Sequence, residues 1–511
     1  MLTIENRDRY TCHRDTRPAA LWGATGLYEL WLPMLLFASA GAITWAIRGT
    51  TGWGGIDGTI VPGLTWAILW YYCCHRKGID ARGIVLWLGM GLALGGELGY
   101  GQYTGWILGR FNVGEDILPI SPVVGYFWFV ICGIGWGAPG GIVLGWALGG
   151  PATPRRWTVR VLLMAVLLAF IFNLGGPLLG QGIIEWLGDR FVQWCPGLLF
   201  PHADQGIYAG ELDRHLGRTV YTNTQNFAVL LWWGVAMLVA AFQRDRATLF
   251  AGAVIGGGFG PGFAIAAAWC HGYAFAPDAI DWWKVWELHS GFNLGLLYAI
   301  VLYWSIRQVD KAAEAEKGPT ALPPATPRTT ILLGIAGFIL VFGAGYEYFF
   351  WAGLAVAMFY VGALFLTLRV SEPGELGERT RSVSLIYSTF LLLFILLHGV
   401  SSRAGVFFEL YGDDAIDQYD WPPARIALFA PALALLLAAT LWAMRKALKY
   451  PTAPASPRLP ERMFDLLTFI GIIGAASIWP SKIGVLYAVF LALAIFALSR
   501  LNRRFDQTDV L

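Results

Sequence analysis

The apolar run that starts at Ile84 ends in the stretch Gly95-Gly96-Glu97-Leu98-Gly99-Tyr100-Gly101-Gln102. Hydrocarbon offers no water to an ionised group, so a carboxylate inside a membrane span must face protein, a cation or a wet cavity. The glycines around Glu97 leave the backbone open to close approach by another helix or by a ligand. Glu97 is therefore the first candidate functional residue of this chain.

A second glycine-rich stretch, Gly256-Gly257-Gly258-Phe259-Gly260-Pro261-Gly262, occurs later in the sequence. Each stretch is followed by a tryptophan with glycines five and nine positions after it; these residues are Trp128, Gly133 and Gly137, and Trp286, Gly291 and Gly295. Two motifs in the same order predict an internal duplication. Coincidence remains the alternative, because short glycine matches arise easily in a chain with 63 glycines.

The composition is that of a membrane protein. Hydrophobic residues make up 56% of the 511 residues and charged residues only 14%, with a mean hydropathy of +0.55. Soluble domains are roughly one-quarter charged. The net charge of +2 is too small to indicate a nucleic-acid partner. We therefore predict an all-α polytopic integral membrane protein whose surroundings are membrane lipid.

Apolar runs of roughly 17 to 25 residues predict about 14 transmembrane helices. The predicted parts are a cytoplasmic N-terminal segment, a first four-helix repeat, a second four-helix repeat with a long external loop, a cytoplasmic linker and a six-helix membrane domain: 1–26, 27–150, 151–306 with the loop at 185–225, 307–330 and 331–511. Each repeat has an even number of spans, so the two repeats would be parallel. The least certain joint is 346–352, where two apolar runs are almost continuous.

Lys and Arg gather in the loops that this count places in the cytoplasm. The sequence therefore predicts a multi-pass protein of the cell inner (cytoplasmic) membrane with both termini cytoplasmic. A single broken helix at 346–352 would invert everything after it.

Polar residues within or beside the predicted spans are the candidate substrate- or ion-binding residues: Arg48, Glu97, Gln102, Asn173, His271, Glu287, His289 and Asn293. At 1.5 Å per residue, Glu97 lies roughly 20 Å and Asn173 roughly 18 Å from the cytoplasmic ends of their spans. Four residues separate His289 from Asn293, which places them on one helix face. The set predicts a polar cavity between the two repeats that opens outward. The alternative is a set of hydrogen bonds and ion pairs that ties the helices together.

The sequence shows no nucleophile elbow, phosphate-binding loop or kinase signature, and we assign no catalytic residue. His271, Glu287, His289 and Glu97 lack the tight spacing of zinc motifs. No metal or other cofactor is predicted.

The leading hypothesis is a transporter or permease for a small polar solute, either sugar-like or an organic anion, with tryptophans stacking on the solute. Proton coupling through Glu97 is expected if only backbone and amides surround it, whereas an ion pair with Arg48 would hold it charged. The six-helix domain would support the fold or form a homo-oligomer interface. The alternatives are a transferase acting on a lipid-linked substrate at the periplasmic face, using the 185–225 loop and the region from His398 to Arg403, and a receptor or scaffold subunit of a membrane complex. An enzymatic role is the less favoured one.

Overall fold

The structure is a computed structural model that describes residues 26–50, 56–75, 79, 81–149, 153–209, 214–316, 375–407, 422–449 and 483–508. These residues are almost entirely helical. Their one sheet is an antiparallel hairpin of β1 (Arg110–Val113) and β2 (Asp116–Pro119), in which Arg110 pairs with Pro119. The predicted all-α class is therefore confirmed.

Seven described helical segments are long and apolar enough to cross a membrane: Leu30–Ile47, Pro122–Leu148, Leu216–Phe242, Arg246–Phe275, Trp282–Val309, Pro423–Lys449 and Ile483–Asn502. A shorter apolar helix covers Thr59–Cys74. Three of the predicted runs, at 331–349, 351–368 and 464–479, lie outside the described residues, as does the joint at 346–352. The total of about 14 spans therefore stays a prediction.

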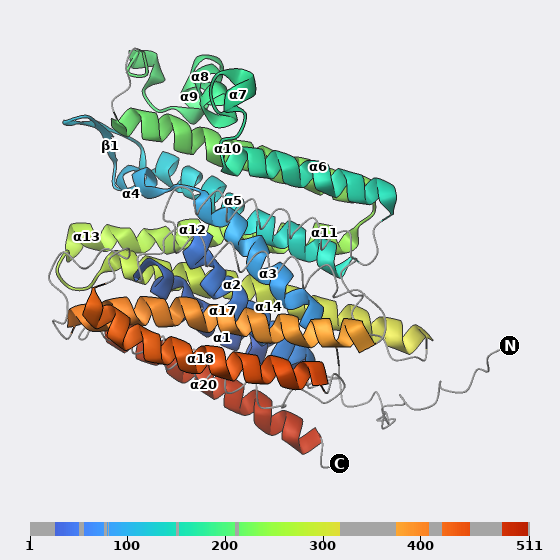
Figure 1. Ribbon diagram of the computed structural model, residues 1–511. Helices are drawn as coiled ribbons and strands as arrows, with labels where there is room; N and C mark the ends of the chain where they lie inside the picture. The colour runs from blue at the N-terminus through green and yellow to red at the C-terminus, as the bar shows by residue number, and fades with distance from the viewer. Residues whose placement is uncertain are drawn as a thin grey trace.

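The long helices run side by side in one bundle (Figure 1). Its central and lower helices in that view are α1 (Gly26–Thr50), α2 (Ile56–His75), α5 (Pro122–Leu148), α14 (Trp282–Glu316), α17 (Glu375–Phe407), α18 (Pro423–Lys449) and α20 (Ile483–Thr508). Helix α1 contacts α14, α2 and α20, and α5 contacts most of the remaining core. The hairpin of β1 and β2 lies at one end of the bundle (Figure 1).

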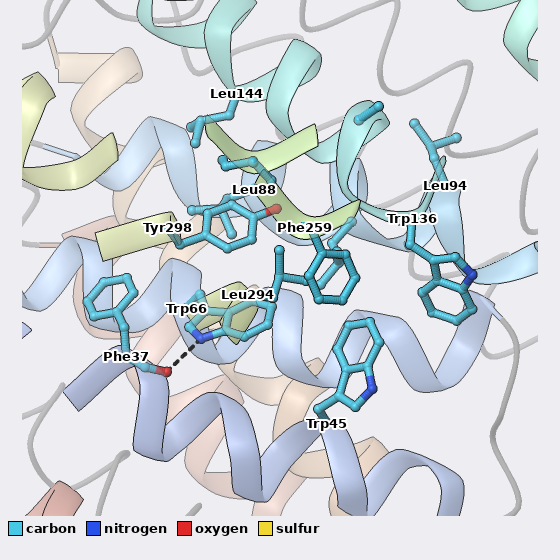
Figure 2. Packing of buried hydrophobic residues seen from close by; sticks show 14 of the residues in the cluster. Phe37, Trp45, Trp66, Leu88, Leu94, Trp136, Leu144, Phe259, Leu294 and Tyr298 are labelled. Carbon is cyan, nitrogen blue, oxygen red and sulfur yellow. Dashed lines mark hydrogen bonds between the residues drawn. The ribbon is translucent and has the colours of Figure 1, made fainter. Parts of the chain in front are cut away.

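Large aromatic side chains fill the interior of this bundle. Figure 2 shows the rings of Trp45, Trp136 and Phe259 gathered together, while Trp66 donates a hydrogen bond from Nε1 to the carbonyl of Phe37 at 3.0 Å. The Trp66 ring also stacks on Tyr298 with centroids 5.0 Å apart. These tryptophans therefore belong to the protein core rather than to an interfacial belt.

The predicted span at 84–103 is not one continuous helix. It consists of η2 (Arg82–Ile84), α3 (Val85–Ala93), η3 (Leu94–Glu97) and, after a non-helical step, α4 (Gly101–Ile107). Leu98 has extended backbone angles, with φ −73° and ψ 119°. Glycine is a poor helix former, so a glycine-rich run favours such an interruption.

The second glycine-rich stretch also departs from α-helical geometry, without ending the helix. The segment consists of α11 (Arg246–Ala251), η5 (Gly252–Gly257), α12 (Gly258–Ala267), η6 (Ala268–His271) and α13 (Gly272–Phe275). The η5 stretch is a π-helix. Such π-helical turns are rare and are frequent at functional sites.

The segment predicted as an external loop, 185–225, is described by the structure apart from residues 210–213. Most of it is helical, in α8 (Ile183–Trp194), α9 (Pro196–Leu199), η4 (Ala203–Gln205) and the start of α10 (Arg214–Phe242). The preceding helix, α6 (Pro154–Ile171), ends before the short α7 (Gly176–Leu179). Helix α8 is amphipathic, with Ile184 and Gly188 buried and Glu185 and Asp189 exposed. It packs against α10 and lies above it in the view of Figure 1. Hydropathy mistook this amphipathic segment for a loop because its outer face is polar.

The two Trp-Gly motifs lie on α5 and α14, and both tryptophans are fully buried. Gly133 and Gly137 face the backbone of α12 and η5, whereas Gly291 and Gly295 face the backbone of α1. In both cases the missing side chain lets two helices approach closely. The partner helices differ, and the internal duplication stays a prediction.

Candidate functional site

The interruption after η3 exposes backbone groups that an unbroken helix would pair internally. The Leu98 carbonyl accepts a hydrogen bond from Trp136 Nε1 at 3.0 Å, and the Gly99 carbonyl accepts one from Asn226 Nδ2 at 2.9 Å. Cys132 Sγ also lies 3.6 Å from the Gly99 carbonyl. Non-helical backbone is tolerated at membrane depth only where protein or water satisfies it. Here α5 and α10 supply the donors.

Helix α10 brings a run of buried polar side chains to this interruption, Thr222-Asn223-Thr224-Gln225-Asn226. Each is 5% exposed or less. Consecutive residues point to all sides of a helix, so this stretch of α10 is enclosed on every side. Sequence reasoning missed the run because it assigned the first four of these residues to the external loop at 185–225 and left Asn226 outside the next span. Treating them as a helical extension of the apolar run at 227–242 would have revealed them.

Hydrogen bonds join this polar run to α4. Tyr103 donates its hydroxyl to Asn223 Oδ1 at 2.9 Å, and Gln102 Nε2 lies 3.5 Å from the same oxygen. Asn226 Nδ2 lies 3.3 Å from the Tyr103 hydroxyl, while Asn223 Nδ2 donates to the Leu199 carbonyl at 2.6 Å. We call Gln102, Tyr103, Asn223 and Asn226 the amide network. Two of its buried oxygens, Gln102 Oε1 and Asn226 Oδ1, have no hydrogen-bond partner within the described residues.

One member of the polar run has an evident structural role. Gln225 Nε2 donates to the carbonyls of Ile171 at 3.0 Å and Phe170 at 3.3 Å. These carbonyls lie at the end of α6, where a helix lacks internal donors. Gln225 therefore caps α6 and stands apart from the amide network.

Aromatic rings surround Tyr100, the last residue of the interruption. Its ring centroid lies 5.0 Å from Trp286, 5.8 Å from Trp136, 5.8 Å from Phe263 and 5.9 Å from Trp283. Tyr100 and Trp283 are partly exposed, whereas Trp136, Trp286 and Phe263 are buried. These five residues form the aromatic cluster, which joins the broken helix to the start of α14.

A buried ion pair adjoins this cluster. Lys284 Nζ pairs with Glu287 Oε2 and donates to the Ala46 carbonyl at 3.2 Å. Trp283 Nε1 donates to Glu287 Oε1 at 3.3 Å. Both charged residues are at most 4% exposed. Glu287 was predicted as a ligand, and the structure shows that its charge is compensated by Lys284, which sequence reasoning missed.

The other predicted residues, His289 and Asn293 of α14 and His271 of η6, each hydrogen-bond to a neighbouring helical segment. His289 Nδ1 accepts a hydrogen bond from Trp269 Nε1 at 3.0 Å, and Asn293 Nδ2 donates to the Gly262 carbonyl at 2.8 Å. Both therefore reach the segment 262–269, in keeping with a shared helix face. His271 Nε2 lies 3.0 Å from the Tyr126 hydroxyl, which ties η6 to α5. These contacts join helices rather than converge on the broken helix.

The remaining predicted residues have different outcomes. Asn173 lies in the turn after α6, with φ 48°, accepts a hydrogen bond from the Ile184 amide at 2.8 Å and donates to Glu185 at 3.2 Å. It therefore fixes the approach to α8 instead of joining Glu97. Glu97 ends η3, is partly buried and takes part in an interaction of its own. The Arg48 side chain lies outside the described part of the structure.

No group of three or more His, Cys, Asp or Glu residues within the described ranges is placed to hold a metal ion. The apolar helices and the enclosed polar contacts define an all-α membrane protein with an interrupted helix in its bundle. No family model, curated protein or solved structure matches the chain.

Proposed function

We propose that the protein is a membrane transporter for a small polar solute. The observation that carries the proposal is that Asn223 and Asn226, two of five consecutive buried polar residues of α10, hydrogen-bond to the broken helix. Burying a polar side chain costs free energy unless it is hydrogen-bonded. A run of five buried polar residues therefore stabilises the helix contact less than apolar residues would, which favours a functional role for the run. Transporters commonly place solute sites at discontinuous membrane helices.

The proposed roles follow from position. Gln102 and the rest of the amide network would bind polar groups of the solute, and the aromatic cluster would offer ring faces for stacking. Glu97 lies one residue before the interruption and is the proposed residue for coupling to protons or another cation. Glu287 would act through its pair with Lys284, which fixes the start of α14 beside the aromatic cluster.

The transferase alternative places the 185–225 segment and the region from His398 to Arg403 around a lipid-linked donor, with a lateral opening between helices and a pocket that reaches this segment. In the described part of that segment, α8 packs against α10. The side chain of His398 lies outside the described residues. The transporter is therefore the better-supported function.

Uptake by reconstituted protein tests the proposal. Purified wild type and Glu97→Gln would be placed in liposomes and compared for uptake of a panel of labelled sugars, polyols and organic acids. Glu115→Gln is the matched control, because Glu115 is exposed in the turn between β1 and β2. We expect wild type and Glu115→Gln to accumulate the same solute, and Glu97→Gln to be at least about tenfold slower, a loss of about 1.4 kcal/mol of transition-state stabilisation.

Two results would count against this function. Equal uptake by Glu97→Gln and wild type would remove Glu97 from the mechanism. Uptake no faster than in protein-free liposomes for every solute would remove transport itself.

A further inference from the structure

The unpaired atoms of the amide network are both of one chemical kind. Gln102 Oε1 and Asn226 Oδ1 are carboxamide oxygens, which accept hydrogen bonds and cannot donate them. The donors of the same amides are already used: Asn226 Nδ2 bonds the Gly99 and Thr222 carbonyls, at 2.9 and 3.0 Å, and Gln102 Nε2 faces Asn223. A ligand that completes this network must therefore bring donors.

The orientation of the Asn226 amide is set by its surroundings. Its nitrogen faces two backbone carbonyls, which require a donor, so exchanging its nitrogen and oxygen would leave these carbonyls facing an acceptor. Asn226 is fully buried, and an unmade hydrogen bond there costs about 1–3 kcal/mol. The free oxygen is thus a property of the fold.

Charge near the network argues against an anionic solute. The network itself contains amides and a phenol and no cation. Lys284 is paired with Glu287. Arg218 lies beside Gly101 but is exposed, where water and salt screen its charge. A carboxylate only accepts hydrogen bonds, so it could not pair with the two unpaired carboxamide oxygens.

A bare metal cation fits less well than hydroxyl groups. Hard cations such as calcium take about six to eight oxygen ligands, whereas the network has two unpaired carboxamide oxygens. Hydroxyl groups donate one hydrogen bond each and still accept others. In the adjacent aromatic cluster Tyr100 and Trp283 stack on each other and are partly exposed, so these two rings are the ones that a sugar ring would contact.

We infer that the solute is a neutral polyhydroxylated molecule, a sugar or polyol, whose hydroxyls donate to Gln102 Oε1 and Asn226 Oδ1. This inference rests on the proposed transport function and selects the sugar-like solute over the organic anion.

The test measures equilibrium binding to purified full-length protein in detergent. Glucose, glucosamine and glucuronate share one ring and differ in carrying no charge, an ammonium or a carboxylate; sorbitol and gluconate repeat the comparison for open chains. Gln102→Met removes the free oxygen at nearly constant length. Gln181→Met is the matched control, because Gln181 bonds Asp189 at 3.0 Å in the turn before α8, outside the network.

We expect glucose, sorbitol or both to bind at least about tenfold more tightly than the charged analogues of the same series. Gln102→Met should weaken that binding by about fivefold to tenfold, close to the loss of one neutral hydrogen bond, and Gln181→Met should not. Preference for glucuronate, gluconate or glucosamine, no binding of any neutral probe, or equal losses in both variants would overturn the inference.

Uptake by the same preparation separates the two proposals. Specific glucose or sorbitol binding without flux into liposomes would leave the solute class standing and contradict transport. Flux of a carboxylate in place of a neutral solute would contradict the solute class and leave transport standing.

Discussion

At the scale of single residues, a side chain predicted to bind a ligand is paired with another side chain of the protein. Glu287 was predicted as a binding residue because a carboxylate in an apolar helix needs a partner. Its partner, Lys284, is three residues earlier on the same helix. Removing one member of a buried pair leaves an uncompensated charge, whereas replacing both by apolar groups is often neutral.

The first prediction concerns this ion pair. Lys284→Met and Glu287→Leu should each lower the free energy of unfolding by about 3–5 kcal/mol, because each leaves one buried charge alone. The double variant should recover most of that loss. Equilibrium unfolding in detergent for all four proteins measures the coupling, and additive losses in the double variant would refute the interpretation.

The second prediction concerns the hydrogen bond that holds the broken helix. Trp136 and Trp128 are both buried on α5, but only Trp136 donates its indole N–H to the interruption, while Trp128 Nε1 has no partner within the described residues. Trp→Phe removes similar volume at both positions. Trp136→Phe should therefore be less stable than Trp128→Phe by about 1–3 kcal/mol, the cost of leaving the Leu98 carbonyl unpaired.

The thermal unfolding of the two Trp→Phe variants measures this difference. Equal melting temperatures would show that the Leu98 carbonyl does not depend on Trp136.

At the scale of helices, contact between backbones decides which elements pack together. Gly41 on α1 and Gly291 on α14 face each other so closely that a methyl group on either would meet the other's carbonyl. Gly295 repeats the arrangement against Phe37. This seam holds the N-terminal helix against α14 and thereby positions the Lys284–Glu287 pair beside Ala46.

The third prediction tests this seam. Gly291→Ala should destabilise the protein by about 1–3 kcal/mol, because the added methyl overpacks the contact. Gly234→Ala on α10 is the control, since no neighbour lies within 4 Å of the position its methyl would take. It should be neutral or stabilising by up to about 1 kcal/mol through better helix propensity. Melting temperatures in detergent that fall equally for both variants would contradict the prediction.

At the scale of the whole molecule, the surface changes character along α10. Its first half is covered by α8, whose exposed residues include Glu185 and Asp189. Its second half exposes an apolar stripe that includes Val235 and Leu238. Apolar side chains are stable against lipid, whereas ionised carboxylates require water. The outer face of α8 is therefore expected at the membrane–water interface.

The fourth prediction concerns this boundary and the orientation of the chain. In a Cys195→Ser background, Asp189→Cys should react in intact cells with a membrane-impermeant maleimide, since the sequence predicts this side to be external. Val235→Cys, on the lipid-facing stripe, should not react. Labelling of Asp189→Cys only after the cells are opened would reverse the predicted orientation.

Much of the fold could be predicted because hydropathy is a local property. The apolar runs correctly indicated α1, α5, α12, α14, α18 and α20. The sequence indicated the glycine-rich stretches only as places of close approach, but both departures from regular helix overlap them. A run rich in glycine weakens a helix wherever it lies, so no knowledge of neighbours would have been needed there. Of the candidate site, the sequence predicted only Glu97 and Gln102.

By itself, the sequence determined an all-α chain of apolar helices with a glycine-rich stretch around Glu97. Only the tertiary structure decided that the polar run of α10 is buried and that it meets this stretch. The physical reason is that a polar side chain is stable either in water or in the protein interior when its hydrogen bonds are made. A hydropathy window cannot distinguish these two environments. Tyr103 and Asn223, which join the two elements, are separated by 120 positions in the sequence. Partners so far apart are found only when the chain folds and each buried donor meets its acceptor.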